Sequence, residues 1–270
     1  ELPLETLRVQ STRCIDTQFA EAPWDWRASP NAVVAVANRW QCDPRWTFMS
    51  LQSKSFELVS SSESPVAERI AALWSKRTVD GEFIADIYVG PKMHQERDQR
   101  YKYARDFNIS FCADGKSLSS GYTFRLTGYG NRAENSDIFP PSQLLRGKTV
   151  VAERDVHLDR TIHRDWFNIR VERRFVSIEQ TLDDQVVLVP ASEFRIWVND
   201  KPITKDNQEG GALAAIVFTD PDPLPGSYFA IWTYDMGMII PRVRLSADGV
   251  LNLEHPDFDP GSDLDCPFNE

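Results

Sequence analysis

Two segments of the chain, residues 81–89 and 106–112, alternate apolar and polar side chains with the two-residue period of a β-strand. The apolar set is Phe83, Ala85, Ile87 and Val89 in the first segment and Phe107, Ile109 and Phe111 in the second. The opposite set is Glu82, Ile84, Asp86 and Tyr88 in the first and Asp106, Asn108, Ser110 and Cys112 in the second. We therefore expect each strand to place one face in an apolar core and to present carboxylates on the other.

Strand-like runs continue from about residue 33 to residue 245, and turn signals such as Asp80-Gly81, Asn199-Asp200 and Asp248-Gly249 separate them. No long segment with the 3.6-residue period of a helix competes with these strands. The pattern predicts an all-β fold, an antiparallel β-sandwich. We expect one sandwich domain over residues 1–253 and an extended acidic tail over residues 254–270.

The composition limits the possible partners. The chain has 270 residues, 41% of them hydrophobic, enough for a sizeable core, and it has no apolar run of the length that spans a membrane. The formal charge is −10 and the basic residues are scattered, so nucleic acid and anionic membranes are poor partners. A neutral or weakly charged ligand is preferred unless Lys and Arg cluster locally. The oligomeric state stays open.

The four cysteines, Cys14, Cys42, Cys112 and Cys266, are far apart and show no CxxC spacing. This spacing disfavours a zinc knuckle or a redox pair and favours one or two structural disulfides. Three full pairings are possible; we favour Cys14 with Cys42 and Cys112 with Cys266, and buried free thiols are the alternative. Because the chain begins with Glu1, we expect a processed protein that is secreted or periplasmic.

The order of several sequence elements resembles a known superfamily. These elements include Ala72-Leu73-Trp74-Ser75-Lys76, the string HRDWFNIRV at 163–171, Trp197-Val198-Asn199-Asp200 and Ala230-Ile231-Trp232. Over residues 19–246 the layout resembles the concanavalin A-like lectin/glucanase superfamily, which includes laminin-G-like jelly rolls, and it is similar to 3-keto-disaccharide-hydrolase-like domains. The resemblance implies a jelly-roll sandwich and a poly- or oligosaccharide as partner. It also implies a structural calcium ion, which sandwiches of this superfamily often bind. The superfamily hosts lectins, hydrolases, lyases and adhesion modules.

The carboxylates of the two alternating strands are the candidate catalytic residues: Asp86, Asp106 and Glu82. Retaining glucanases of this superfamily carry Glu-x-Asp-x-x-Glu on one strand, and no such string occurs here. Glu82 and Asp86 lie about 13 Å apart along one strand, too far for a retaining pair. Asp86 and Asp106 would stand about 5 Å apart if their strands were neighbours in register. The alternative is that these carboxylates lie on a solvated outer face.

Aromatic and polar residues on or near these strands are the candidate ligand-binding residues. Sugar rings have apolar faces that stack on Trp and Tyr, and their hydroxyls accept hydrogen bonds from Lys, Arg and Asn. The candidates are Lys76, Tyr88, Asn108, Tyr122, Arg125, Trp232 and Tyr234. For Trp232, the alternative is a strand that is buried on both faces.

No other chemistry is indicated by a motif. The histidines lack metal-ligand spacing, and neither Gly-x-Ser-x-Gly nor a glycine-rich phosphate loop is present. We therefore expect that no cofactor is required for chemistry. Asp257, Asp259 and Asp263 in the tail are weak candidates for calcium ligands, and an acidic tail without a metal is the favoured alternative.

The leading functional hypothesis is a secreted carbohydrate-active protein that cleaves glycosidic bonds as a hydrolase, with a lyase as a variant. The second hypothesis is a non-catalytic carbohydrate-binding or adhesion module, and the third is a structural interaction domain. Release of reducing ends would distinguish the first from the others.

Overall fold

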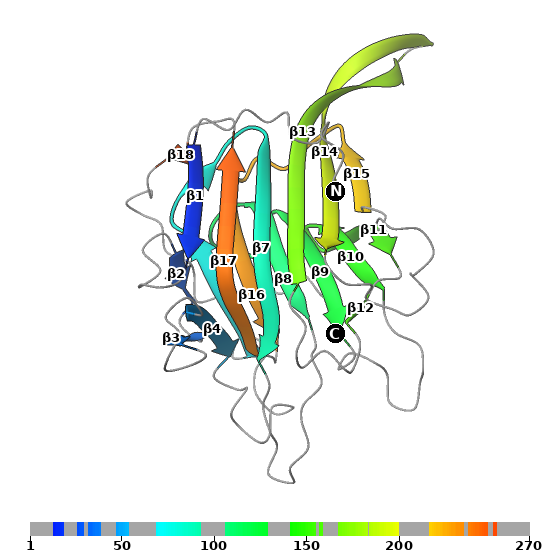
Figure 1. Cartoon of the computed structure of the whole chain (residues 1–270). Helices are drawn as coiled ribbons and strands as arrows, with labels where there is room; N and C mark the ends of the chain where they lie inside the picture. The colour runs from blue at the N-terminus through cyan, green and yellow to red at the C-terminus, as the bar shows by residue number, and fades with distance from the viewer. Residues whose placement is uncertain are drawn as a thin grey trace, which may run out of the picture.

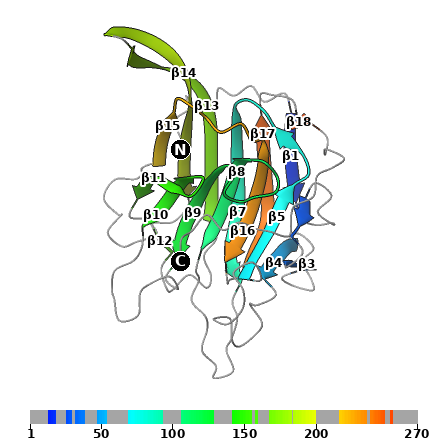
Figure 2. The ribbon, with the colours of Figure 1, turned by 180° about the vertical axis from the view of Figure 1, so that it is seen from behind.

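The computed structural model describes residues 13–18, 26–29, 32–38, 47–53, 69–92, 106–128, 141–154, 157–158, 167–182, 184–199, 216–234, 237–247 and 251–252. These residues form two facing β-sheets, which Figure 1 and Figure 2 show from opposite sides. Within the described residues no helix is long and apolar enough to cross a bilayer.

Sheet A has the strand order β15 (Ile216–Asp220), β14 (Gln185–Asn199), β13 (Phe167–Leu182), β7 (Phe83–Lys92), β17 (Gly237–Ala247), β4 (Thr47–Ser53) and β3 (Ala32–Asn38), and β1 (Arg13–Gln18) also pairs with β17. Sheet B has the order β11 (Thr149–Arg154), β10 (Ser142–Arg146), β9 (Tyr122–Gly128), β8 (Phe107–Ala113), β16 (Tyr228–Tyr234), β5 (Ile70–Ser75) and β2 (Trp26–Ala28). The two-residue strand β12 (His157–Leu158) runs parallel to β9, and β6 (Thr78–Val79) pairs with β18 (Leu251–Asn252).

The chain crosses between the sheets repeatedly, as in a jelly roll. It passes from β4 in sheet A to β5 in sheet B, from β7 to β8, from β15 to β16, and back to β17. All pairs in the two large sheets except the one with β12 are antiparallel. The predicted antiparallel sandwich of jelly-roll type is therefore confirmed.

The main core lies between the sheets and is formed by the apolar halves of the alternating strands. Phe83, Ala85, Ile87 and Val89 from β7 and Phe107, Ile109 and Phe111 from β8 all belong to it, as the alternation predicts. Aromatic rings join the two layers: the ring centroids of Phe83 and Phe229 are 4.9 Å apart, and those of Phe111 and Phe194 are 5.4 Å apart. Edge-to-face and tilted pairs of this kind add to the stabilisation from burial.

The central strands of sheet B are also buried on their second face, the face that points away from the main core. A separate apolar cluster lies there, made of Ile70, Ala72, Trp74, Ala113, Leu118, Tyr228, Ala230, Trp232 and Tyr234. Every residue of β5, β8 and β16 is buried. The two alternating sets of side chains in these strands therefore face two different apolar clusters, and neither set faces solvent. Trp232 thus lies in a strand buried on both faces, the alternative raised by the sequence.

The two longest strands differ from the sequence prediction. The sequence predicts three separate strands here, at residues 166–172, 175–182 and 194–198. The first two segments instead form one strand, β13, and its partner β14 begins earlier than predicted, at Gln185. At the turn between them Asp184 has a φ of 62°, a conformation that Asp tolerates better than most residues. The distal parts of both strands extend beyond sheet A as a two-stranded ribbon (Figure 1).

The predicted disulfide between Cys112 and Cys266 is not formed, because Cys112 is a free, buried thiol. It was expected on the polar face of β8, but it lies in the main core with a φ of 50°, where the register of β8 and β16 shifts. Burial raises the pKa of this thiol to about 11, so it is protonated and unreactive at neutral pH. Cys42, Cys266 and the acidic tail lie outside the described residues, and so do residues 55–59, for which the sequence predicts a strand.

The irregular end of β8 leads to a prediction about Gly226. A Cβ at position 226 would overlap the backbone of Cys112 and Ala113, and the adjoining Ser227 amide donates to the Ala113 carbonyl at 2.9 Å. We expect Gly226→Ala to lower the free energy of unfolding by about 1 to 3 kcal/mol or more, because backbone must move to accept the methyl group. Chemical denaturation measures this loss. Ser227→Ala keeps the backbone contact and is the control; equal stability of the two variants would contradict the close approach.

Candidate functional site

The polar halves of β7 and β8 lie on opposite sides of the sandwich. β7 belongs to sheet A and β8 to sheet B, and the apolar halves of both face the same core. Asp86 therefore points away from the core on the outer face of sheet A, whereas Asp106 lies on the second face of sheet B. The predicted cross-strand pair of Asp86 with Asp106 is not formed, because the chain changes sheets between the two strands.

The outer face of sheet A carries a row of charged and aromatic residues across four strands. Arg244 of β17, Asp86 of β7, Arg170 of β13 and Trp197 of β14 occupy successive register positions. The next row consists of Arg242, Tyr88, Asn168 and Asn199 on the same strands. Strand pairing thus assembles residues from four distant parts of the sequence on one face.

Asp86 is held in place by Arg170. The Arg170 Nε donates to Oδ1 of Asp86 at 2.7 Å and Nη2 donates to Oδ2 at 3.1 Å. The hydrogen bond to Asp86 raises the pKa of Arg170. Because Asp86 is only 8% exposed and both of its oxygens are engaged, it is a fixed acceptor rather than a freely moving acid or base.

Two buried acceptor atoms near this ion pair have no hydrogen-bond donor. They are Oε1 of Glu172 and Oδ1 of Asn168, both on β13 and on the same face as Arg170. The other oxygen of Glu172 accepts from Nη2 of Arg174 at 3.2 Å. Burial raises the pKa of Glu172, despite the arginines near it. Buried oxygens without donors are costly, so these two atoms favour a ligand or water that supplies hydrogens.

Tyr88 and Trp197 complete the outer face of sheet A as half-buried aromatic side chains. They lie in neighbouring rows, on β7 and β14, with β13 between them. A ring that stacks on an aromatic side chain would place its substituents near Asn168 and the Asp86–Arg170 pair. The face therefore offers apolar contact together with acceptors and donors, the combination that binds polyhydroxylated rings.

The second face of sheet B holds five other predicted site residues, Asp106, Asn108, Arg125, Trp232 and Tyr234, and most of them are buried. Across five strands the register row reads Trp232, Asn108, Arg125, Gln143 and Glu153. Trp232 is fully buried and its Nε1 donates to the Ser110 hydroxyl at 2.9 Å.

Three more of the predicted residues are engaged on this second face. Asp106 is 0% exposed and forms an ion pair with Nε of Arg125 at 3.0 Å. Tyr234 is buried beneath the guanidinium of Arg69, 4.5 Å from its ring centroid. The predicted sugar platform of Trp232 and Tyr234 is therefore wrong, because both rings pack into the second apolar cluster.

Asn108 is the exception in this row. It is 0% exposed, and neither its Oδ1 nor its Nδ2 has a hydrogen-bond partner. Its neighbours across the strands are Trp232 and Arg125. Such a site suits an ordered water, because a buried amide that makes no hydrogen bond is costly.

The remaining predicted residues are dispersed. Lys76 lies in the turn between β5 and β6 and not on a sheet face. Glu82 precedes β7 and accepts a hydrogen bond from the Phe175 amide at 2.7 Å. Tyr122 points into the main core, where its ring stacks on Phe111 with a centroid distance of 5.6 Å. It does not form a surface platform with Tyr88.

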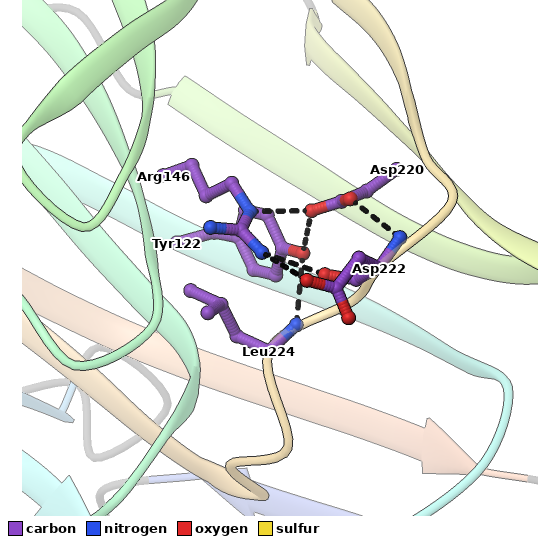
Figure 3. Close-up of polar contacts among 5 residues, drawn as sticks. All are labelled: Tyr122, Arg146, Asp220, Asp222 and Leu224. Atoms are coloured by element: carbon purple, nitrogen blue, oxygen red, sulfur yellow. Dashed lines mark hydrogen bonds and ion pairs between the residues drawn. The ribbon is translucent and has the colours of Figure 1, made fainter.

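Tyr122 instead joins the two sheets through a polar network with Arg146, Asp220 and Leu224 (Figure 3). Its hydroxyl donates to Oδ2 of Asp220 at 2.6 Å and accepts from the Leu224 amide at 3.2 Å. Nε of Arg146 donates to the same Asp220 oxygen at 2.7 Å. The network connects β15 of sheet A with β9 and β10 of sheet B, so it is structural.

Electrostatics of this network favour the ionised form of Asp220. Burial opposes ionisation, but the hydrogen bonds from Tyr122, Arg146 and the Asp222 amide outweigh it and lower the pKa of Asp220. Burial and the hydrogen bond to Asp220 raise the pKa of Tyr122, so the phenol keeps its proton.

Metal-binding geometry is absent from the described part of the chain, where no three His, Cys, Asp or Glu side chains gather to hold an ion. The weak calcium candidates Asp257, Asp259 and Asp263 lie outside the described residues. Neither result places a calcium ion in this protein.

The sequence analysis missed Asn168, Arg170, Glu172 and Trp197. The signal that could have found the first three is the alternation in β13, where Phe167, Ile169 and Val171 enter the core between them. The sequence alone does not show that β13 pairs with β7, because the two strands lie about eighty residues apart in the chain.

Comparison with known proteins gives structural matches alone. No family model matches the chain, and no curated protein of similar sequence was found. The chain is similar in fold to the carbohydrate recognition domain of Emp46p in its potassium-bound form, with a TM-score of 0.38 and 10% identity over 84% of this chain and 89% of that one. It is also similar to the cellulose induced protein Cip1, with a TM-score of 0.40 and 9% identity over 86% and 96%. These matches concern the fold.

The Tyr122 network gives a prediction with a pH dependence. Tyr122→Phe should lower the free energy of unfolding by about 1 to 2 kcal/mol at pH 7, because Asp220 loses a donor and the Leu224 amide loses its acceptor. A lowered carboxyl pKa stabilises the fold above the unfolded-state value near 4, and this contribution is lost as the pH falls. The difference between wild type and variant should therefore shrink in acid.

Denaturant unfolding at several pH values measures this effect. Asp222→Ala is the matched control, because the Asp222 side chain is 98% exposed at 3.5 Å from Arg146 and should contribute little. A Tyr122→Phe deficit that stays constant down to pH 3 would show that Asp220 is not the partner that matters.

Proposed function

We propose that this protein binds carbohydrate through the outer face of sheet A. The site consists of Tyr88 and Trp197 as the aromatic contacts and Asn168, Glu172 and the Asp86–Arg170 pair as the polar contacts. The observation that carries the proposal is the pair of buried, unpaired acceptors on β13, Oε1 of Glu172 and Oδ1 of Asn168. Sugar hydroxyls are donors that would satisfy both.

The polar residues of this face favour a neutral ligand. Three of its arginines already have carboxylate partners: Arg170 with Asp86, Arg174 with Glu172 and Arg195 with Glu193. Arg242 and Arg244 also lie on this face, but three of its five named arginines are compensated within the chain. The whole chain carries a net charge of −10, which disfavours an anionic polymer. We therefore propose a neutral saccharide, which the composition of the chain also favours, as the ligand of this face.

Binding without cleavage fits the carboxylates better than hydrolysis. Asp86 and Asp106 lie on opposite sides of the sandwich, and each is engaged by an arginine. One of the proteins similar in fold is a carbohydrate recognition domain, which agrees with the proposal. The support for it comes from the residues of this chain.

Hydrolysis is a second candidate because of Glu172. Burial raises its pKa, as a general acid requires. Glu172 pairs with Ile84 and Arg170 pairs with Asp86, so the two carboxylates are diagonal neighbours. The Cβ separation of such neighbours is about 7 Å, which allows the two carboxyl groups to reach the spacing found in inverting glycosidases. The bidentate contact with Arg170 occupies both oxygens of Asp86, and hydrolysis therefore ranks second.

Calorimetric titration with neutral and uronic-acid oligosaccharides tests the binding proposal. We expect a neutral oligosaccharide to bind, and Trp197→Ala and Asn168→Ala each to weaken its affinity about tenfold or more, because stacking or a hydrogen bond is lost. Gln143→Ala on the second face of sheet B is the matched control. Loss of affinity in the control but not in Trp197→Ala would place the ligand on sheet B, and binding of no saccharide would contradict the proposal.

Release of reducing ends distinguishes the two candidate functions. On the binding proposal, the wild-type protein releases no product from a saccharide that it binds. Product that appears with wild type, declines as the pH rises through the pKa of Glu172, and is abolished by Glu172→Gln would establish hydrolysis. Glu193→Gln, a carboxylate on the neighbouring strand that is paired with Arg195, is the control for a nonspecific charge effect.

A further inference from the structure

The two aromatic side chains on the outer face of sheet A stand too far apart to contact the same sugar ring. Tyr88 of β7 pairs with Asn168, and Trp197 of β14 pairs with Arg170, so β13 lies between the two rings and they occupy different rows. Figure 1 shows the three strands side by side in this order. Neighbouring strands are about 4.8 Å apart and two residues along a strand span about 6.6 Å, which places the Cα atoms of Tyr88 and Trp197 about 12 Å apart.

The two buried acceptors without donors are separated to a similar extent. Oδ1 of Asn168 and Oε1 of Glu172 belong to residues that are four positions apart on β13 and face the same side. Four residues of strand span about 13 Å. Because side chains stand roughly perpendicular to the sheet, the acceptor atoms keep much of this separation. A pyranose ring is shorter than either distance, so one ring does not reach both aromatic residues or both acceptors.

Each aromatic residue has one of these acceptors beside it. Tyr88 is the direct cross-strand partner of Asn168. Trp197 is a diagonal neighbour of Glu172, whose direct partner on β14 is Arg195. Side chains of direct and diagonal neighbours on one face of a sheet are within reach of each other. The face therefore contains two units of the same composition, an aromatic side chain together with a hydrogen-bond acceptor.

Arg170 lies between the two units. It is two residues from Asn168 and two residues from Glu172 on β13, and Asp86 fixes its guanidinium through Nε and Nη2. A guanidinium carries more hydrogens than this pair uses. A ligand that extends from one unit to the other passes over Arg170, which can donate to an oxygen that links two sugars.

We propose that this face has two sugar subsites, one formed by Tyr88 and Asn168 and the other by Trp197 and Glu172, and that its ligand is a linear oligosaccharide that fills both. The inference rests on the proposed carbohydrate-binding function and adds the length and direction of the ligand. The oligosaccharide runs obliquely across β13, from β7 towards β14. A monosaccharide fills one subsite and leaves the acceptor of the other without a donor, so it binds more weakly.

Calorimetric titration of the wild-type protein with neutral saccharides of increasing length tests the two subsites. The probes are matched series of glucose, mannose and xylose oligomers, from the monosaccharide to the tetrasaccharide. In the series that binds, we expect the affinity to rise at least about tenfold between the monosaccharide and the trisaccharide. Beyond the length that fills both subsites, the affinity should change by less than about twofold. This measurement needs no variant, so it does not depend on how a substitution affects folding.

Variants of the aromatic residues test where the subsites lie. Tyr88→Ala and Trp197→Ala should each remove most of the gain in affinity between the monosaccharide and the trisaccharide. Their effects on the free energy of trisaccharide binding should add in the double variant, because the two residues contact different sugar units. Tyr88→Leu and Trp197→Leu keep apolar volume and replace the alanine variants if these unfold. Phe175→Ala, at a 55% exposed aromatic residue on the opposite side of β13, is the matched control and should preserve the length dependence.

The outcomes separate this inference from the proposed function. A monosaccharide that binds as tightly as the trisaccharide would overturn the two subsites and leave carbohydrate binding intact. Loss of trisaccharide affinity in Trp197→Ala but not in the Tyr88 variants would also overturn the inference, because one subsite would then suffice. Binding of no saccharide of any length would contradict the proposed function and this inference together.

Discussion

The contact between the apolar halves of β7 and β8 is the constraint on which the rest of the structure depends. Phe83 of β7 packs edge-on against Phe111 of β8, with ring centroids 6.2 Å apart, although the two strands belong to different sheets. Burial of each such side chain contributes about 1.5 to 3 kcal/mol, and side chains alternate strictly between the two sides of a strand. Once these apolar halves share one core, the polar halves must point in opposite directions. A site that combines Asp86 with Asp106 is therefore excluded by the same contact that stabilises the sandwich.

That constraint gives the two polar faces different roles. The central strands of sheet B are buried on both sides, and their second face uses Asp106, Arg125 and Ser110 to satisfy polar groups beside the buried Trp232. Sheet A keeps its polar face partly open, with half-buried aromatic residues and arginines among its carboxylates. Ligand recognition is thus favoured on sheet A, while the polar residues of sheet B mainly serve the interior.

The sequence correctly predicted the properties that depend on residues close together in the chain. It failed for the properties that depend on which distant segments pair as neighbouring strands. The alternation in residues 81–89 and 106–111 identified the core side chains of β7 and β8 correctly, and it placed Asp86 and Tyr88 on one face. It could not tell which strands are neighbours, because β13 reaches β7 from about eighty residues away. Trp232 was misassigned for another reason: in β16 both alternating sets are buried, so the period of two carries no information about exposure.

The outer face of sheet A also shows why a carboxylate in a promising sequence pattern need not be the reactive one. Asp86 accepts two hydrogen bonds from Arg170, one on each carboxylate oxygen, and these fix its orientation. Glu172, one step along the neighbouring strand, has one oxygen bound and the other buried without a donor. The same arginine-rich surroundings thus supply hydrogen bonds to both oxygens of Asp86 but leave one oxygen of Glu172 without a hydrogen-bond donor. A hydroxyl that donates to Glu172 would remove this deficit whether or not a bond is cleaved, so ligand binding alone is a sufficient reason for the arrangement.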